Sequence, residues 1–212
     1  MFHILTVCTG NVCRSPMAEA ILRDRLKDLA DFTVASAGTD ALVGLPPTPQ
    51  TVAVLTALGL PSGPSHQARQ LTPELVRQAD LVLALSRQHR RSVAELEPRA
   101  TQRIFTLREF GYVSQWIRPA DIVEARLTLP IERLGADNQQ TVLRAAVAAV
   151  GAKSGLAVAA VDPEELDVQD PFGRPLEAYA ESAVRILPAV EATAEFLKEA
   201  RALSEAARGP IF

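Results

Sequence analysis

The chain of 212 residues has only two cysteines, Cys8 and Cys13, which are five positions apart. A disulfide between two cysteines so near each other in sequence cannot stabilise a secreted fold. A basic excess is also missing, because the formal net charge is −3, and this argues against a general nucleic-acid binder. Met1–Val7 is too short and lacks the flanking charge of a signal peptide, and Val142–Val161 is too interrupted to span a membrane. We therefore expect a cytoplasmic protein that binds neither nucleic acid nor membranes.

Short apolar runs alternate with helical patterns along most of the chain. This alternation predicts an α/β fold, with a parallel sheet and helices on both faces. Strands are predicted at Phe2–Val7, Thr33–Ser36, Leu81–Leu85 and Arg103–Thr106. Helices are predicted at Met17–Leu29 with Ser15 as cap, Gln50–Leu58, Thr72–Gln78, Leu176–Ala206, and from Ser86 through Glu95.

The region Val113–Leu166 departs from this alternation. It contains no clear strand and one predicted helix, Asn138–Val150, together with the lone Trp116. We interpret the chain as a single domain, residues 1–212, that carries a mostly helical or irregular insertion at about 113–166. The pattern leaves open whether this region is an insertion on the core or a small subdomain.

The segment Cys8–Ser15 carries the clearest chemistry, because it lies between a predicted strand and a predicted helix. Backbone N–H groups of such a loop converge on an anion, together with the helix N-terminus. Gly10 predicts a special backbone conformation, and Asn11 tolerates a left-handed one. Arg14 offers two parallel donors to phosphate oxygens, and Cys8 in this positive field is expected to be largely thiolate, with Ser15 donating a hydrogen bond to the sulfur. The coincidence of these residues favours a nucleophilic thiolate over an inert buried cysteine.

These residues resemble a known family. The run Val7-Cys8-Thr9-Gly10-Asn11-Val12-Cys13-Arg14-Ser15-Pro16-Met17-Ala18-Glu19 is similar to the signature of low-molecular-weight protein tyrosine phosphatases. Further matches, in family order, are Ser36-Ala37-Gly38-Thr39, Ser65-His66-Gln67-Ala68-Arg69 and Asp170-Pro171-Phe172-Gly173. The resemblance covers 1–112 and 167–200, and it implies a flavodoxin-like four-stranded parallel sheet and a reaction without metal or other cofactor.

The resemblance also implies a role for each site residue. Cys8 attacks phosphorus and forms a cysteinyl-phosphate, Arg14 and the loop amides hold the phosphate oxygens, and Asp170 is the general acid and base. Asp-Pro dipeptides also start turns, as at Asp162, but only Asp170 is followed by Phe-Gly. The phosphate-binding loop comprises Thr9, Gly10, Asn11, Val12, Cys13, Arg14 and Ser15.

Three further residues receive supporting roles by the same resemblance. Ser36 and His66 are expected to hydrogen-bond Asn11 and fix the shape of the loop. Cys13 is expected to form a reversible disulfide with Cys8 that protects the nucleophile from irreversible oxidation, although a small apolar filler is an equally good interpretation. His3 and His89 have no visible partners and are expected to be incidental.

The expected substrate is a phosphotyrosine-containing protein or a small aryl phosphate. Val12 favours phosphotyrosine, because similar arginine phosphatases carry Thr at this position, and Phe172 is a candidate aromatic wall. Against this, the loop 40–44 lacks the Trp or Tyr that many family members place at the pocket rim. The alternatives are a phosphoarginine phosphatase, an arsenate reductase that uses a small thiol, and a catalytically silent phosphoprotein-binding module. The insertion is a candidate surface for a protein partner or a candidate part of the pocket rim.

Overall fold

The protein is described by a computed structural model that covers residues 1–60, 66–135, 137–158 and 162–206. Among these residues the strands form one four-stranded sheet in the order β2-β1-β3-β4, and every pairing is parallel. The strands are β1 Phe2–Cys8, β2 Phe32–Gly38, β3 Leu81–Ala84 and β4 Ile104–Thr106. The predicted parallel α/β sheet is therefore confirmed, with the apolar run at 81–84 in a central strand.

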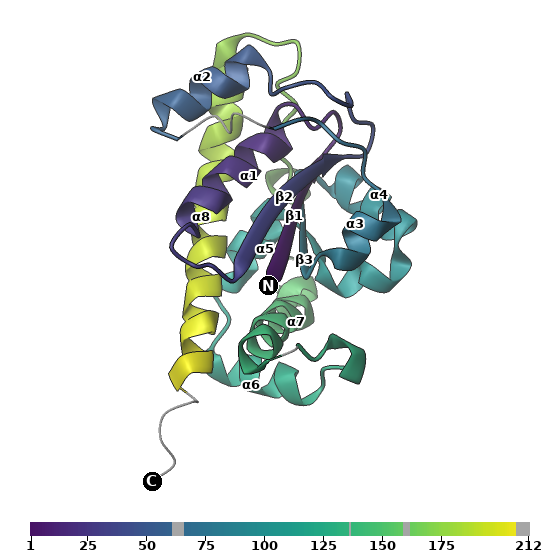
Figure 1. Cartoon of the computed structure of the whole chain (residues 1–212), viewed down its shortest axis with the longest axis vertical. Coiled ribbons are helices and arrows are strands. Elements are labelled where there is room, and N and C mark those ends of the chain that lie inside the picture. Colours follow the sequence, from purple (N-terminus) through teal and green to yellow (C-terminus); the bar gives the residue numbers. More distant parts are fainter. Residues whose placement is uncertain (61–65, 136, 159–161, 207–212) are drawn as a thin grey trace.

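Helices cover both faces of the sheet (Figure 1). The α-helices are α1 Arg14–Arg25, α2 Pro49–Ala57, α3 Pro73–Gln78, α4 Arg87–Leu96, α5 Leu107–Ser114, α6 Pro119–Leu127, α7 Asn138–Val158 and α8 Leu176–Ala206. Short 3-10 helices are η1 Pro98–Arg103, η2 Ile131–Arg133 and η3 Pro163–Leu166. Alternate strand residues feed two apolar cores, since Ile4 and Leu83 pack on the side of α1, α5 and α8 whereas Leu5 and Val82 pack against α3 and α4.

Several helices begin at a residue whose side chain caps the helix N-terminus. Ser86 accepts a hydrogen bond from a backbone N–H group of α4, as expected of a residue that starts a helix, and Thr72 caps α3 in the same way rather than lying within it. The predicted cap at Ser15 is wrong, because α1 begins one residue earlier, at Arg14, and the Ser15 side chain is needed inside the loop. Helix α1 also ends at Arg25 rather than at Leu29. The sequence pattern missed α5, although Thr106 and Glu109 form a capping box at its start.

The region 113–166 is helical, and its α6 and the start of α7 lie towards the amino-terminal ends of the strands (Figure 1). Its end, η3, leads back to the carboxyl-terminal end of β3, where the Val168 N–H donates to the Leu85 carbonyl. Helix α7 begins at Asn138 as predicted but continues to Val158. Its Arg144 Nε lies 2.7 Å from Oδ1 of Asp80, the residue just before β3. Trp116 is 63% exposed and packs against Tyr112, so it does not anchor the region to the core.

No helix in the described part of the chain combines the length and the apolar character that a membrane span requires.

Candidate active site

The thiol of Cys8 lies at the carboxyl-terminal end of β1 and is buried, with 2% of the residue exposed. Its Sγ is 3.0 Å from the Ser15 hydroxyl oxygen, which in turn accepts a hydrogen bond of 2.9 Å from the Asn11 amide Nδ2. Because an amide N–H already fills an acceptor position of the Ser15 oxygen, its own proton is available to the sulfur. The Ser15 hydroxyl is thus placed to donate to the Cys8 sulfur, with the more distant Ala37 carbonyl, at 3.5 Å, as its other acceptor.

Asn11 holds the loop in a left-handed conformation, with φ at 56°, and it is the one non-glycine residue with positive φ in the described part of the chain. Its Nδ2 also donates to Ser36 Oγ (2.8 Å), and its carbonyl accepts from His66 Nε2 (2.9 Å). Both predicted contacts to Asn11 are thus present. The predicted reason for Gly10 is wrong, because Gly10 does not adopt a positive φ. The strained position of the loop is Asn11, whose contacts offset the strain.

Glu19 supports this network from below, although the sequence reasoning gave it no role. Ser36 Oγ donates to Glu19 Oε2 (2.5 Å), and the His66 ring lies 3.5 Å from the same oxygen. Burial opposes ionisation of both groups, yet their mutual interaction prevails, so the pKa of Glu19 is lowered and the pKa of His66 is raised. Glu19 is four residues after Ser15 on α1, a helical spacing that placed it on the same face.

His89 is the second residue that the sequence reasoning missed, since it was expected to be incidental. Its Nε2 is 2.8 Å from Oγ1 of Thr9 in the loop, and its Nδ1 is 2.8 Å from the Ser86 hydroxyl that caps α4. Burial and the nearby Arg14 charge lower the pKa of His89 to about 4. The ring is therefore neutral at pH 7, with one donor and one acceptor nitrogen, and it joins α4 to the loop.

The guanidinium group of Arg14 faces the predicted acid. Arg14 Nη2 lies 2.7 Å from Asp170 Oδ2, and its Nη1 donates to the Val168 carbonyl (3.1 Å). The Arg14 side chain is 6% exposed, whereas that of Asp170 is 52% exposed. The remaining nitrogen, Arg14 Nε, is buried, and its N–H has no hydrogen-bond partner among the described residues. One donor of the fork is therefore free for an oxyanion, and a second is bound to a carboxylate that solvent reaches.

The segment before Asp170 is anchored to the end of β3. Val168 N donates to the Leu85 carbonyl (2.9 Å), and Asp167 accepts from both the backbone N–H and the guanidinium of Arg87. Asp170 Oδ1 itself accepts from the backbone N–H of Phe172 (3.2 Å), which shapes the turn. These contacts hold the carboxylate over the loop.

A cavity of about 170 Å³ opens above Cys8. Both predicted wall residues, Val12 and Phe172, line it, and Phe172 is 55% exposed at its rim. Asp40 and Leu42, which the sequence reasoning did not assign, complete the rim, because their loop is hydrogen-bonded to the phosphate loop through Asp40 N–Thr9 O and Leu42 N–Gly10 O. The full lining is Cys8, Thr9, Gly10, Val12, Cys13, Arg14, Asp40, Leu42, Asp170 and Phe172.

Cys13 also lines this cavity as a buried free thiol. Its Sγ is 3.7 Å from both the Thr48 hydroxyl and the Tyr179 hydroxyl. Burial raises the pKa of Cys13, so this thiol is neutral at pH 7. The predicted disulfide with Cys8 stays a prediction.

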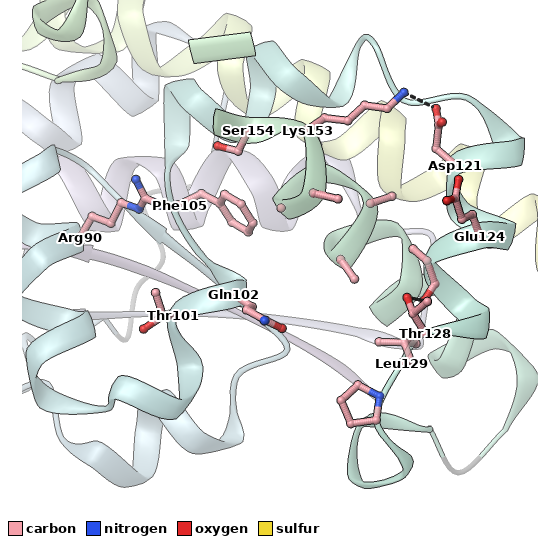
Figure 2. Close-up of a pocket in the computed structure, with 16 residues that line it drawn as sticks. Arg90, Thr101, Gln102, Phe105, Asp121, Glu124, Thr128, Leu129, Lys153 and Ser154 are labelled. Carbon is pink, nitrogen blue, oxygen red and sulfur yellow. Dashed lines mark hydrogen bonds and ion pairs between the residues drawn. The ribbon is translucent and has the colours of Figure 1, made fainter. Parts of the chain in front are cut away.

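The described residues of 113–166 contribute nothing to the lining of this cavity, so the idea that the insertion shapes the rim is wrong for them. They line a larger cavity instead, of about 560 Å³, between α6 and α7 on one side and α4, η1 and β4 on the other (Figure 2). Lys153 and Asp121 pair across part of it at 2.6 Å. None of the predicted site residues lies there.

The family model of the low molecular weight phosphotyrosine protein phosphatases matches residues 3–122. The chain belongs to this family. A protein named probable low molecular weight protein-tyrosine-phosphatase EpsP, from Ralstonia solanacearum, is 42% identical over 106 residues, which are 50% of this chain and 70% of EpsP. The protein-arginine-phosphatase of Bacillus subtilis is 39% identical over 108 residues, 50% of this chain and 71% of that protein.

A solved structure of the YwlE arginine phosphatase from Geobacillus stearothermophilus matches with a TM-score of 0.64 and 28% identity, over 94% of each chain. The flavodoxin-like fold and the prediction of a cysteine-dependent phosphatase are confirmed. The family match stops before the acid loop, so it does not reach Asp170.

Proposed function

We propose that the protein hydrolyses phosphate monoesters on protein side chains, phosphotyrosine first, through a cysteinyl-phosphate on Cys8. The observation that supports this most is the joint placement of the Cys8 thiol, the free Nε of Arg14 and the Asp170 carboxylate around one cavity. A module that only bound phosphoproteins would need the cation but not the acid. Retention of all three groups therefore favours an enzyme.

The proposed reaction starts when a phosphate dianion enters and replaces Asp170 as a partner of Arg14. The Arg14 fork and the amides at the start of α1 hold the phosphate oxygens. Once the dianion has displaced it from Arg14, the Asp170 carboxylate takes up a proton from solvent. The Cys8 thiolate then attacks phosphorus, so the S–P bond forms as the P–O bond to the leaving group breaks, and Asp170 gives this proton to the leaving oxygen. Water then attacks phosphorus, Asp170 takes the proton, and the thiolate leaves.

Ser15 and His89 support this machinery in different ways, one at the sulfur and one at the side of the cavity. Ser15 donates its proton to the Cys8 sulfur and so stabilises the thiolate both as nucleophile and as leaving group. His89 positions the side chain of Thr9, which lines the cavity. The Asn11, Ser36, His66 and Glu19 network keeps the loop amides directed at the phosphate.

An apolar wall supports an aryl phosphate as substrate. Val12, Leu42 and Phe172 provide the hydrocarbon surface of the cavity, and an aromatic ring packs well between such side chains. Asp40 favours a second candidate, phosphoarginine, because its carboxylate lines the same cavity and would attract a guanidinium group. The two candidate substrates differ in charge, so removing the Asp40 carboxylate should lower the hydrolysis of phosphoarginine but not that of phosphotyrosine.

The first experiment compares the wild type with Cys8→Ser and Asp170→Asn on an aryl phosphate, phosphotyrosine, phosphoarginine and arsenate. Cys8→Ser should lose roughly 10³-fold or more in kcat, and Asp170→Asn roughly 10²- to 10⁴-fold. Cys13→Ser and Asp162→Asn are matched controls, since the first keeps the nucleophile and the second removes the other Asp-Pro acid. Full hydrolysis by Cys8→Ser would refute the mechanism, and thiol consumption with arsenate but no hydrolysis would identify an arsenate reductase instead.

A second experiment addresses the substrate. We expect Asp40→Asn to leave phosphotyrosine hydrolysis within about twofold and, if phosphoarginine is turned over, to lower that activity by roughly tenfold, the effect of one charge-assisted contact. Val12→Thr should shift the ratio of the two activities towards phosphoarginine. A preference for phosphoarginine in the wild type would reverse the order of the two candidates.

We also propose that 1–212 is one phosphatase domain, because α7 residues such as Leu143 and Val147 belong to the same apolar core as Ile4 of β1 and Leu197 of α8. The cytoplasmic location and a protein partner for the insertion remain predictions.

A further inference from the structure

A third cavity, of about 570 Å³, lies between α5 and α8 and shares no residue with the cavity above Cys8. On α5 its residues have helical spacing, and on α8 they flank a helix-internal proline. The two backbones meet at its floor, since a Cβ on Gly111 would lie 2.7 Å from the Ala189 carbonyl oxygen. The lining is Arg108, Gly111, Tyr112, Gln115, Glu165, Val184, Arg185, Pro188 and Ala189, which we name the α5–α8 groove.

Two guanidinium groups in the α5–α8 groove have no ion-pair partner among the described residues. Arg108 Nη1 is buried without a hydrogen-bond partner, and Arg185 is exposed. Burial and the like charge of Arg185 both lower the pKa of Arg108, and Glu165 only partly opposes them. A buried donor without a partner costs free energy that an anionic ligand would recover. The groove therefore has the charge and the free donors of an anion site.

The α5–α8 groove lies at the same edge of the sheet as the phosphate site. Arg108 is in the first turn of α5, directly after β4, so it lies at the same edge of the parallel sheet as Cys8. Glu165 belongs to η3, five residues before Asp170. Because the two cavities have no residue in common, a polypeptide bound at the phosphate site has a separate place to contact this protein.

We propose that the α5–α8 groove binds an acidic segment of the phosphoprotein substrate, with Asp or Glu carboxylates on Arg108 and Arg185. The inference rests on the proposed function, because it assumes a protein substrate. Arginine matches carboxylates through two parallel N–H donors.

A peptide segment fits the groove better than a free ion does. Tyr112 and Val184, which is 72% exposed, supply apolar surface beside the charges, and Trp116 extends that surface through its contact with Tyr112. Pro188 has no N–H to donate to the Val184 carbonyl, so this carbonyl is a possible acceptor for a peptide N–H. A small inorganic anion would use neither feature.

The binding test uses fluorescence anisotropy with a labelled peptide of Glu-Gly repeats, and with Gln-Gly and Lys-Gly peptides of equal length. We expect only the Glu-Gly peptide to bind, with an affinity that falls as salt rises. Arg108→Gln and Arg185→Gln should each weaken it by roughly three- to tenfold, the effect of losing one charge-assisted contact, whereas the exposed Arg91→Gln on α4 is the matched control. Equal loss in all three variants, or no binding, would refute the groove as a docking site.

The kinetic test uses two phosphotyrosine peptides that differ only in an acidic or a neutral flank. In Arg108→Gln and Arg185→Gln we expect KM for the acidic peptide to rise by roughly three- to tenfold, with kcat unchanged, and the values for the neutral peptide and for a small aryl phosphate to stay within about twofold. Equal effects on both peptides would contradict the proposal. Displacement of the Glu-Gly peptide by an equal concentration of inorganic phosphate would show a free-ion site and overturn it.

The two tests keep this inference separable from the proposed function. Peptide binding needs no catalysis, so arginine-dependent binding by a protein that fails to hydrolyse aryl phosphate would leave the groove standing and refute only the phosphatase assignment. Hydrolysis of aryl phosphate without arginine-dependent peptide binding would support the phosphatase assignment and refute the groove as a docking site.

Discussion

Arg14 and Arg144 lie at opposite ends of the sheet, and each has a nitrogen 2.7 Å from an aspartate carboxylate. At the carboxyl-terminal end the arginine is the buried partner, with a free Nε, and its acid Asp170 is half exposed. At the amino-terminal end the acid is the buried partner, since Asp80 is 4% exposed and also accepts the His3 N–H. In the Arg14–Asp170 pair the Arg14 Nε has no partner and the carboxylate is open to solvent. In the Arg144–Asp80 pair the carboxylate is buried and accepts two hydrogen bonds. In the proposed reaction the Arg14–Asp170 pair opens when phosphate enters, whereas the Arg144–Asp80 pair stays closed and joins α7 to the sheet.

Replacing each arginine by lysine should give the largest difference between the two ends. Arg14→Lys keeps the charge but loses the planar fork, and we expect kcat/KM on an aryl phosphate to fall by roughly 10³-fold. Arg144→Lys should leave kcat/KM within about twofold and cost about 1–2 kcal/mol of stability in urea, because it loses hydrogen bonds to Asp80 and to the Leu134 carbonyl. A similar loss of kcat/KM in both variants would show that the two arginine–aspartate pairs do not differ in function.

Asn11→Asp and Leu143→Ala should separate activity from stability. Asn11→Asp preserves the shape of the side chain and tolerates its left-handed backbone, but it removes the amide donor to Ser15 and Ser36. We expect it to lower kcat/KM by roughly 10²-fold and stability by about 2 kcal/mol. Leu143→Ala opens a cavity under α7 and should cost about 3 kcal/mol with unchanged kcat/KM. Activity loss in Leu143→Ala at a temperature where it is folded would link the insertion to the chemistry.

The lowered pKa of His89 should make the stability of the folded protein depend on pH. Its pKa is about 4 in the folded protein and about 6.5 when unfolded, so the unfolded state binds the proton first as the pH falls. The wild type should therefore keep this contribution above pH 6.5 and lose about 2–3 kcal/mol as the pH falls from about 6.5 to 4. His89→Gln should flatten this part of the pH profile in urea titrations, whereas His3→Gln at the exposed edge is the control. An unchanged profile in His89→Gln would argue against the buried neutral imidazole.

Cys13→Ala should have the smallest effect on turnover. We expect kcat/KM to stay within about threefold, since Cys13 is a neutral thiol beside the nucleophile rather than a reacting group. After mild peroxide, reducing agent should restore the wild type but not the variant, and mass spectrometry should find a Cys8–Cys13 disulfide only in the wild type. Equal recovery of both proteins would leave Cys13 as an apolar filler.

The sequence alone was enough to locate the loop, to assign the chain to its family and to predict the class of fold. Cys8, Asn11, Arg14 and Ser15 lie within eight residues of each other, so their geometry depends on one strand end, one turn and one helix start. The strand runs and the caps at Thr72 and Ser86 are local as well, and local patterns are what periodicity and capping rules detect. Element ends shifted by a few residues, and α5 was missed despite its capping box.

Only the tertiary structure decided which distant residues complete the site. His89 comes to Thr9 across 80 positions, Asp170 reaches Arg14 from the far end of the chain, and Leu42 and Asp40 form the rim because their loop is hydrogen-bonded to the phosphate loop. The start of α7 lies at the other end of the sheet, where Arg144 pairs with Asp80, although the insertion returns through η3 to the acid loop that directly follows it. Spacing along the chain carries no information about such pairs, because packing of the sheet and its helices sets their distance. The phosphate loop was therefore predictable from its own residues, and its surroundings were not.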